Sequence, residues 1–401
     1  MRFKTTAWRL GVGTGLASLT CWAAVVTAAP HIVPDPPPIS SKSYVLMAAG
    51  TDRVIAERDS AAPLPPASLT KIMTSYVAAV ELDAGRIALT DDVPISVGAW
   101  RTGGSRMFVR EGTTVKLEDL LRGIVIQSGN DASVAVAEFI AGDEDAFGDM
   151  MNVHAKDLGL RDSRFVNSTG LPDDGHYSSA HDLAVLSARL IERYPDHYAM
   201  YRERAFTFAD IEQPNRNKLL WRDKSVDGVK TGLTEAAGYC LVASALRDGT
   251  RLIVATMGAD TDSQRFQDAQ KLLAYGFRYY ENRQLYEADE VLATPEVWFG
   301  TAESVAVGVT DALTITLPRG RYDDLEAVLD LPRNLEAPID AGARVGTVRV
   351  TLDDDVLAAV PLLAQRAVPE ANVFARMGDS IYLFFRDLLG GEPDALEATG
   401  S

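Results

Sequence analysis

The chain has 401 residues, of which 47% are hydrophobic, 24% charged and 8% aromatic, a composition that excludes collagen-like, low-complexity and largely disordered proteins. Its formal net charge of −17 excludes a broad nucleic-acid-binding role, because phosphate binding needs a basic surface. Two cysteines and five scattered histidines predict neither a zinc site nor another metal cofactor. The length predicts two domains, or three at most.

The first 29 residues have the three-part pattern of a secretory signal peptide, so we expect an exported protein. Three basic residues begin the segment, an apolar stretch follows, and Ala28-Ala29 supplies small residues for cleavage. The alternative is an uncleaved membrane anchor, but glycines interrupt the apolar run, which weakens it against a spanning helix of about 20 residues. A proline-rich linker is expected over residues 30–42.

Residues 43–283 have the pattern of a mixed α/β domain. Strands are predicted at 43–48 and 53–57, and an apolar stripe at helical spacing predicts a helix after Pro66. The further elements are helices over 115–126, 131–141 and 180–192, strands over 226–233, 239–246 and 251–257, and a closing helix over 264–280. Asp248-Gly249 predicts a hairpin turn between the last two strands, so we expect them to be antiparallel neighbours.

Residues 284–369 predict a small all-β domain, with short strands at 304–309, 313–317 and 344–352. An amphipathic helix is predicted at 373–389, within residues 370–391, and an acidic, solvated tail at 392–401. One stripe of this helix carries the apolar residues Phe374, Met377, Ile381, Phe384 and Leu388. A core or dimer helix is the alternative, but its position after a complete β domain favours a helix that lies on a membrane surface.

Three short motifs follow one another along the first domain: Ser68-Leu69-Thr70-Lys71, Ser128-Gly129-Asn130 and Lys230-Thr231-Gly232. Matches to the first two patterns alone are expected by chance in a chain of this length. Their predicted context is specific, however. The first motif begins a helix, where side chains three residues apart lie side by side, the second falls in a break between helices, and the third falls in a strand.

The first motif fits nucleophilic catalysis by a serine. A serine hydroxyl is a poor nucleophile until a neighbouring base removes its proton, and the candidate base beside Ser68 is Lys71. A lysine acts as a base when its pKa is lowered by burial or by a second cation, for which Lys230 is the candidate.

The other motif residues supply the remaining parts of such a reaction. Ser128 can relay a proton to the leaving nitrogen, and Asn130 can hold a substrate amide. Lys230 and Thr231 can bind a carboxylate. The backbone N–H groups of Ser68 and Leu233 are candidates for an oxyanion hole.

Longer stretches around these motifs resemble the serine D-alanyl-D-alanine carboxypeptidases of peptidase family S11, the low-molecular-mass penicillin-binding proteins of bacterial cell walls. The stretches are PPASLTKIMTSY, SGN, FVNSTGLPDDGHYSSAHDLA, NRNKLLW and VDGVKTGLTEAAGYCLVASA, followed by PEVWFG and LPRGR in the β domain. The resemblance implies the penicillin-recognising serine-transferase fold, which is shared with β-lactamases. It also implies an acyl-enzyme on Ser68 and removal of the terminal D-alanine from peptidoglycan pentapeptides, in cell-wall maturation and control of cell shape.

The resemblance assigns a role to each matching position. It implies Lys71 as general base and Ser128 as part of the catalytic proton network, with the substrate bound by Asn130, Lys230, Thr231, Gly232 and Arg216 of the NRN stretch. It further implies no cofactor, covalent inhibition by β-lactams, and a peripheral location at the periplasmic face of the bacterial inner membrane through the C-terminal helix. One departure lies in the site, where Leu233 follows K-T-G and relatives often carry histidine.

Other readings of the same residues predict different functions. A class A β-lactamase would carry S-D-N and a glutamate that positions a deacylating water, and neither has a convincing counterpart. A peptidoglycan endopeptidase would tend to lack the β domain and the terminal helix. A β-lactam or wall-peptide sensor, or a scaffold, is disfavoured by the intact catalytic motifs. A Ser-His-Asp triad through His176 or His181 lacks the G-x-S-x-G elbow, so we expect these histidines to order a loop at the edge of the site.

Overall fold

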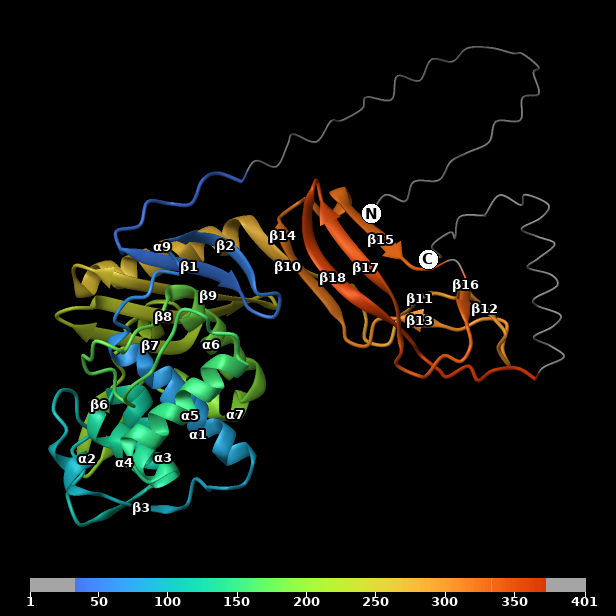
Figure 1. The fold of residues 1–401 in the computed structure, drawn as a ribbon. Coiled ribbons are helices and arrows are strands. Elements are labelled where there is room, and N and C mark those ends of the chain that lie inside the picture. The colour runs from blue at the N-terminus through green and yellow to red at the C-terminus, as the bar shows by residue number, and fades with distance from the viewer. Residues whose placement is uncertain (1–32, 333, 373–401) are drawn as a thin grey trace, which may run out of the picture. The chain divides into compact units, whose positions relative to one another are not determined.

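The computed structural model describes residues 33–332 and 334–372 (Figure 1). The described chain divides into two compact units, one from Pro34 to Tyr279 and one that begins at Tyr280. This division falls four residues before the predicted domain boundary at 283. The predicted signal peptide, terminal helix and acidic tail lie outside the described residues.

A five-stranded antiparallel sheet forms the centre of the first unit, in the order β2-β1-β9-β8-β7. Its strands are β1 (Ser43–Ala48), β2 (Arg53–Arg58), β7 (Val226–Thr234), β8 (Gly238–Arg247) and β9 (Thr250–Ala259). All five predicted strands of this domain are present. Asp248 and Gly249 form the turn between β8 and β9 with φ values of 46° and 76°, the left-handed conformation that a tight hairpin needs.

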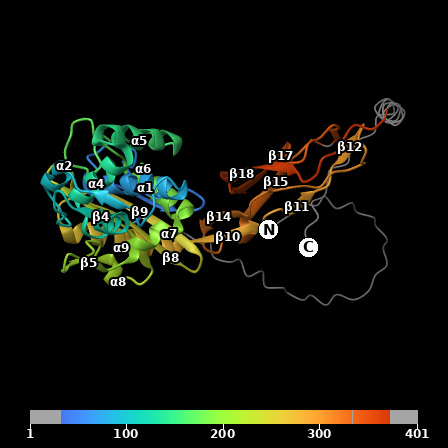
Figure 2. The same cartoon turned by 90° about the horizontal axis from the view of Figure 1, so that it is seen from below.

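Helices cover both faces of this sheet (Figures 1 and 2). On one face lies α9 (Asp262–Tyr279), which approaches so closely that a Cβ at Gly276 would lie 2.5 Å from the Leu252 side chain. Because side chains alternate along a strand, the neighbouring Ile253 points to the opposite face. There it joins the main core with α1 (Lys71–Asp83) and α6 (Ala180–Arg193).

The other elements of the first unit are mostly short. They are the helices α2 (Val97–Arg101), α3 (Leu117–Arg122), α4 (Asn130–Ala141), α5 (Glu144–Asp157), α7 (Pro195–Tyr198) and α8 (Leu219–Arg222), the 3-10 turns η1 (Ala67–Thr70) and η3 (Ala199–Arg202), and the π-helical turn η2 (Gly123–Gln127). Two antiparallel strand pairs complete the unit: β3 (Asp92–Pro94) with β4 (Thr114–Lys116), on either side of α2, and the hairpin of β5 (Ala205–Phe208) with β6 (Ile211–Pro214).

Two of these helices differ from the sequence prediction. The α-helix predicted over 115–126 is wrong at both ends, because β4 occupies its start and η2 its end. Helix α5 was not predicted. Its apolar signal is narrow, since the buried stripe consists of Phe147, Met151 and Ala155 among polar residues.

The second unit is all β in its described part, apart from one 3-10 turn, η4 (Tyr322–Asp324). Its strands are β10 (Tyr280–Tyr286), β11 (Val291–Ala293), β12 (Glu296–Trp298), β13 (Val307–Gly308), β14 (Leu313–Pro318), β15 (Leu325–Asp330), β16 (Asn334–Glu336), β17 (Arg344–Leu352) and β18 (Asp355–Ala364). A five-stranded sheet, β11-β13-β18-β17-β15, carries the buried Val348 and Val350 of its core. The predicted strands at 313–317 and 344–352 are present, whereas only two residues of 304–309 form a strand.

Across residues 33–332 and 334–372, no helix combines the length and the apolar character needed to cross a bilayer.

Candidate active site

The candidate nucleophile lies in a 3-10 turn rather than in the first turn of an α-helix. Ser68 belongs to η1, and α1 begins only at Lys71. Two glycines allow other segments to pack against this turn. A Cβ at Gly170 would lie 1.8 Å from the Ala67 carbonyl oxygen, and one at Gly232 would lie 3.0 Å from the Pro66 carbonyl oxygen. The K-T-G strand and the 165–171 segment therefore both border the serine.

Lys71 is buried beside this serine. Its Nζ lies 3.2 Å from Ser68 Oγ, and it also donates to Asn130 Oδ1 and to the Thr169 carbonyl, both at 2.6 Å. Burial, and then the positive charge of Arg216, lower the pKa of Lys71 to about 7. A substantial fraction of the amine is therefore neutral near neutral pH, which is the form that accepts a proton.

Lys71 has more than one cationic neighbour. Arg216 lowers the pKa of Lys71, and the mutual repulsion of Lys71 and Lys230 makes Lys230, the expected second cation, a basic neighbour as well. The pKa of Lys230 is itself well below its usual value because of burial and the charges of Lys71, Arg216 and Arg265. The site is thus a cluster of four basic side chains within an acidic protein, and it suits an anionic group of a substrate.

The S-G-N motif lies opposite Lys71. Ser128 ends η2 in a left-handed conformation, with φ of 66°, and its buried Oγ has no hydrogen-bond partner among the described residues. Asn130, expected to hold a substrate amide, accepts from Lys71 and donates its Nδ2–H to the Gly103 carbonyl at 2.7 Å. The adjacent Asp131 carboxylate accepts backbone N–H bonds from residues 107–109 and so fixes that loop to α4.

Strand β7 carries the third motif along the edge of the sheet. Lys230 and Thr231 are buried, and Lys230 Nζ donates to the Thr231 carbonyl at 3.0 Å. The Leu233 side chain is 52% exposed, so it faces solvent directly after the motif. Arg216 approaches the S-G-N motif, where its Nε donates to the Gln127 carbonyl at 2.8 Å.

Sequence reasoning missed two groups that hold this constellation. One is the Thr169 carbonyl, which lies within the quoted FVNSTG stretch but was given no role. The other is Arg265 of α9, whose Nη1 donates to the Gly232 carbonyl at 2.9 Å. A basic residue on an amphipathic helix usually points to solvent, so the sequence carries no signal for this contact.

His176 orders the loop at the edge of the site, as expected. Its Nδ1 accepts from the Val166 N–H at 3.0 Å, which leaves the proton on Nε2, and Nε2–H donates to Thr70 Oγ1 at 2.7 Å. Burial lowers the pKa of His176 to about 4, so the ring is neutral near pH 7. Because it contacts Thr70 and not Ser68, His176 does not complete a serine–histidine triad.

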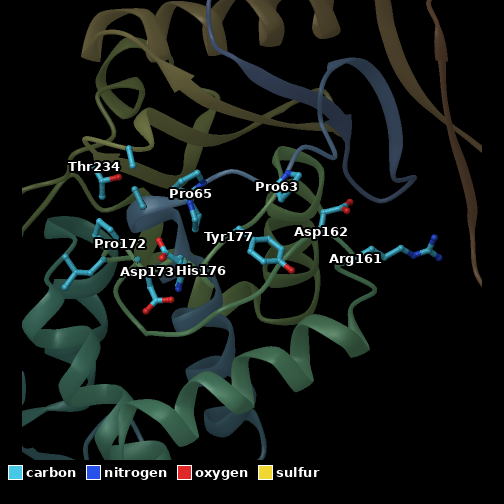
Figure 3. A pocket seen from close by; sticks show the side chains of 15 residues that line it. Pro63, Pro65, Arg161, Asp162, Pro172, Asp173, His176, Tyr177 and Thr234 are labelled. Carbon is cyan, nitrogen blue, oxygen red and sulfur yellow. The ribbon is translucent and has the colours of Figure 1, made fainter.

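A groove of about 550 Å³ begins beside the nucleophile turn. Its lining includes Ala67, Gly170 and Thr234, which are neighbours of the serine, of the Thr169 carbonyl and of the K-T-G motif, respectively. Figure 3 shows the side chains of Tyr177 and Asp173, among others, around it. Within the described residues, no group of three or more His, Cys, Asp or Glu side chains has the arrangement of a metal site.

Comparison with known proteins identifies the family. Residues 30–261 match the family model described as D-alanyl-D-alanine carboxypeptidase, and residues 280–370 match that of the penicillin-binding protein 5 C-terminal domain. The chain is 40% identical to the D-alanyl-D-alanine carboxypeptidase DacC of Escherichia coli (strain K12), in an alignment that covers 95% of this chain and 97% of that relative. This agreement extends over both units.

Solved structures agree with the family assignment. Penicillin binding protein 5 from Haemophilus influenzae matches with a TM-score of 0.81 at 39% identity, over 84% of this chain and 100% of that chain. Penicillin-binding protein D2 from Listeria monocytogenes, solved in an ampicillin-bound form, matches with a TM-score of 0.57 at 27% identity, over 61% of this chain and 100% of that chain. The fold class predicted from the sequence is therefore confirmed, and the chain belongs to the D-alanyl-D-alanine carboxypeptidase family, peptidase family S11.

Proposed function

We propose that this serine D-alanyl-D-alanine carboxypeptidase acts through an acyl-enzyme on Ser68, with Lys71 as the general base. The observation that carries the proposal is the 3.2 Å contact between Lys71 Nζ and Ser68 Oγ, at a lysine whose pKa is lowered to about 7. The neutral amine takes the hydroxyl proton as Oγ bonds to the carbonyl carbon of the penultimate D-alanine.

Neighbouring groups stabilise the developing charge and transfer the protons in the later steps of the reaction. The backbone N–H groups of Ser68 and Leu233 stabilise the tetrahedral oxyanion. The C–N bond then breaks as the leaving nitrogen receives a proton through Ser128, whose buried hydroxyl has no other partner among the described residues. D-alanine departs, and water attacks the ester in a second step that returns the proton and frees Ser68.

Substrate recognition rests on charge. The terminal carboxylate of a peptidoglycan pentapeptide meets Arg216, Thr231 and Lys230, in the positive cluster described above, with Gly232 and Asn130 lining its path. The peptide on the acyl side of the scissile bond follows the groove that begins at Ala67 and Gly170. β-Lactams present a strained amide beside a carboxylate, so they acylate the same serine.

The proposal extends to location and domain roles. Residues 1–29 direct export and are removed, residues 43–283 carry catalysis, and residues 284–369 form the β domain. Residues 370–391 hold the enzyme peripherally at the periplasmic face of the inner membrane through the apolar stripe of the terminal helix.

Mass spectrometry of the intact mature protein tests the central step. We expect penicillin to add its full mass to the peptide that contains Ser68, and we expect D-alanine release from a pentapeptide to exceed penicillin hydrolysis. The Ser68→Ala variant should do neither. Labelling of that variant at wild-type stoichiometry would show that another residue is the nucleophile.

A further inference from the structure

Helix α5 holds the segment 165–169 at three successive turns. Asn152 accepts from the Phe165 N–H at 2.9 Å and donates to the Phe165 carbonyl at 2.7 Å. One turn earlier, Gly148 lets the segment approach, since a Cβ there would lie 3.1 Å from the Val166 carbonyl oxygen. In the first turn, Glu144 Oε1 accepts from the Ser168 N–H at 3.1 Å and from Ser168 Oγ–H at 2.7 Å.

The end of this segment touches the catalytic lysine. The Thr169 carbonyl accepts from Lys71 Nζ at 2.6 Å, and the Ser168 carbonyl accepts from Thr74 Oγ1 at 2.7 Å, one helical turn further along α1. Glu144 therefore binds Ser168, the residue directly before Thr169, whose carbonyl holds Lys71. Ser168 is fully buried, so its N–H and hydroxyl would lose their acceptors if the carboxylate were removed.

Glu144 also brings a negative charge to a cationic site. Among the charged groups around Lys71, Arg216 lowers its pKa, and Asp131 and Glu144 raise it. Lys230 is a further basic neighbour, and His176 is neutral near pH 7. Asp131 already accepts several backbone N–H bonds that hold the 107–109 loop, so of the two acids Glu144 is the one whose charge can be altered without releasing that loop.

We propose that Glu144 is a positioning residue for the carboxypeptidase reaction: it fixes the carbonyl that holds the Lys71 amine, and its charge sets the pH range in which that amine accepts the Ser68 proton. The proposal rests on the role of Lys71 as base. Glu144 contacts neither Ser68 nor the substrate. It acts through the 168–169 segment and through the effect of its negative charge on Lys71.

Two variants separate the effect of the hydrogen bonds to Ser168 from the effect of the negative charge. Glu144→Gln keeps an oxygen acceptor for Ser168 but removes the charge, so we expect the acid limb of the acylation profile to move to lower pH by about half a unit. Below the midpoint, acylation should then be about threefold faster than in the wild type, with an unchanged plateau. Glu144→Ala also loses the acceptor, and its plateau should fall about five- to tenfold.

The measurement is the second-order rate of acylation by a chromogenic β-lactam, recorded from pH 5 to 9 on the mature protein. Asp145→Asn is the matched control, because it removes one negative charge from the same first turn of α5 at an exposed position. Its profile should coincide with that of the wild type. Lys71→Ala, assayed in parallel, tests the base on which the proposal rests.

The outcomes are distinguishable. A Glu144→Gln profile that coincides with the wild type, or moves to higher pH, while Lys71→Ala is inactive, would overturn the role of Glu144 and leave the proposed function intact. An equal shift in Asp145→Asn would overturn it too, because the effect would then belong to net charge. Acylation of Lys71→Ala at the wild-type rate would overturn both the base and this inference.

Discussion

Replacing Gly170 with alanine tests whether the close fit around the nucleophile turn is needed for catalysis. The added Cβ would lie 1.8 Å from the Ala67 carbonyl oxygen and 2.7 Å from Thr70 Oγ1, whereas ordinary contact begins near 3.4 Å. The turn that carries Ser68 and the segment that carries Thr169 must therefore separate by roughly 1.5 Å. A misplacement of about 1 Å at reacting groups costs on the order of 10²-fold in rate. We expect acylation to fall by about that factor.

Gly159→Ala is the matched control for this variant. Gly159 also has a positive φ, 73° against 80° at Gly170, but nothing lies within 4 Å of a Cβ placed there. Both variants incur the cost of a left-handed alanine, roughly 1–2 kcal/mol of stability, but only one disturbs the site. Stopped-flow acylation by a fluorescent penicillin measures the rate, and circular dichroism reports whether each protein is folded. Equal acylation rates in two folded variants would refute the argument.

Three further predictions follow from the site and the chain end. Lys71→Ala should retain the fold but lose acylation, because the Ser68 hydroxyl loses its base. Labelling with fluorescent penicillin measures the acylation rate, and a wild-type rate would require another base. Arg216→Ala should raise the pKa of Lys71, so the neutral fraction at pH 7 falls and the acid limb of kcat/KM moves to higher pH; a shift to lower pH would contradict the electrostatic role of Arg216. A chain ending at Pro369 should be soluble and active, whereas the full mature chain should sediment with membranes even in high salt. The apolar stripe predicted at 373–389 would bury several side chains in the membrane surface, each worth roughly 1.5–3 kcal/mol. Fractionation of the two chains decides this, and a fully soluble mature protein would show that the helix packs elsewhere.

The location of Lys71 supports its proposed role as the base, a role that histidine has in other serine hydrolases. An exposed lysine is almost fully protonated at pH 7 and cannot accept a proton. Here burial and Arg216 lower its pKa, while three acceptors at Ser68, Asn130 and Thr169 keep the amine oriented. Burying the basic cluster costs free energy of desolvation, which fixed hydrogen-bond partners offset. The loops around the site are held in place by side-chain hydrogen bonds.

Local sequence signals determined much of the catalytic domain. Period-two patterning located the last three strands of its central sheet, and a turn signal at 50–52 located the first two. The Asp248-Gly249 pair located a hairpin, because the backbone preferences of these residues are strong and local. The three motifs identified a serine, two lysines and an asparagine that the structure brings into one site. The predicted context of the motifs and the longer stretches that resemble a known family made this assignment possible, because the first two motifs alone are expected by chance.

Tertiary packing alone decided how these residues interact. Arg216 lowers the pKa of Lys71, and Arg265 of α9 donates to the Gly232 carbonyl of the K-T-G strand. The sequence placed Arg216 in the site only as a substrate-binding residue, and it gave Arg265 no role. The electrostatic effect of a charge depends on burial and distance, which are set by segments far apart along the chain. Helix α5 was missed because its narrow apolar stripe is only a weak signal for a helix. The contact of Glu144 with Ser168 was missed because it depends on the tertiary position of the 165–169 segment.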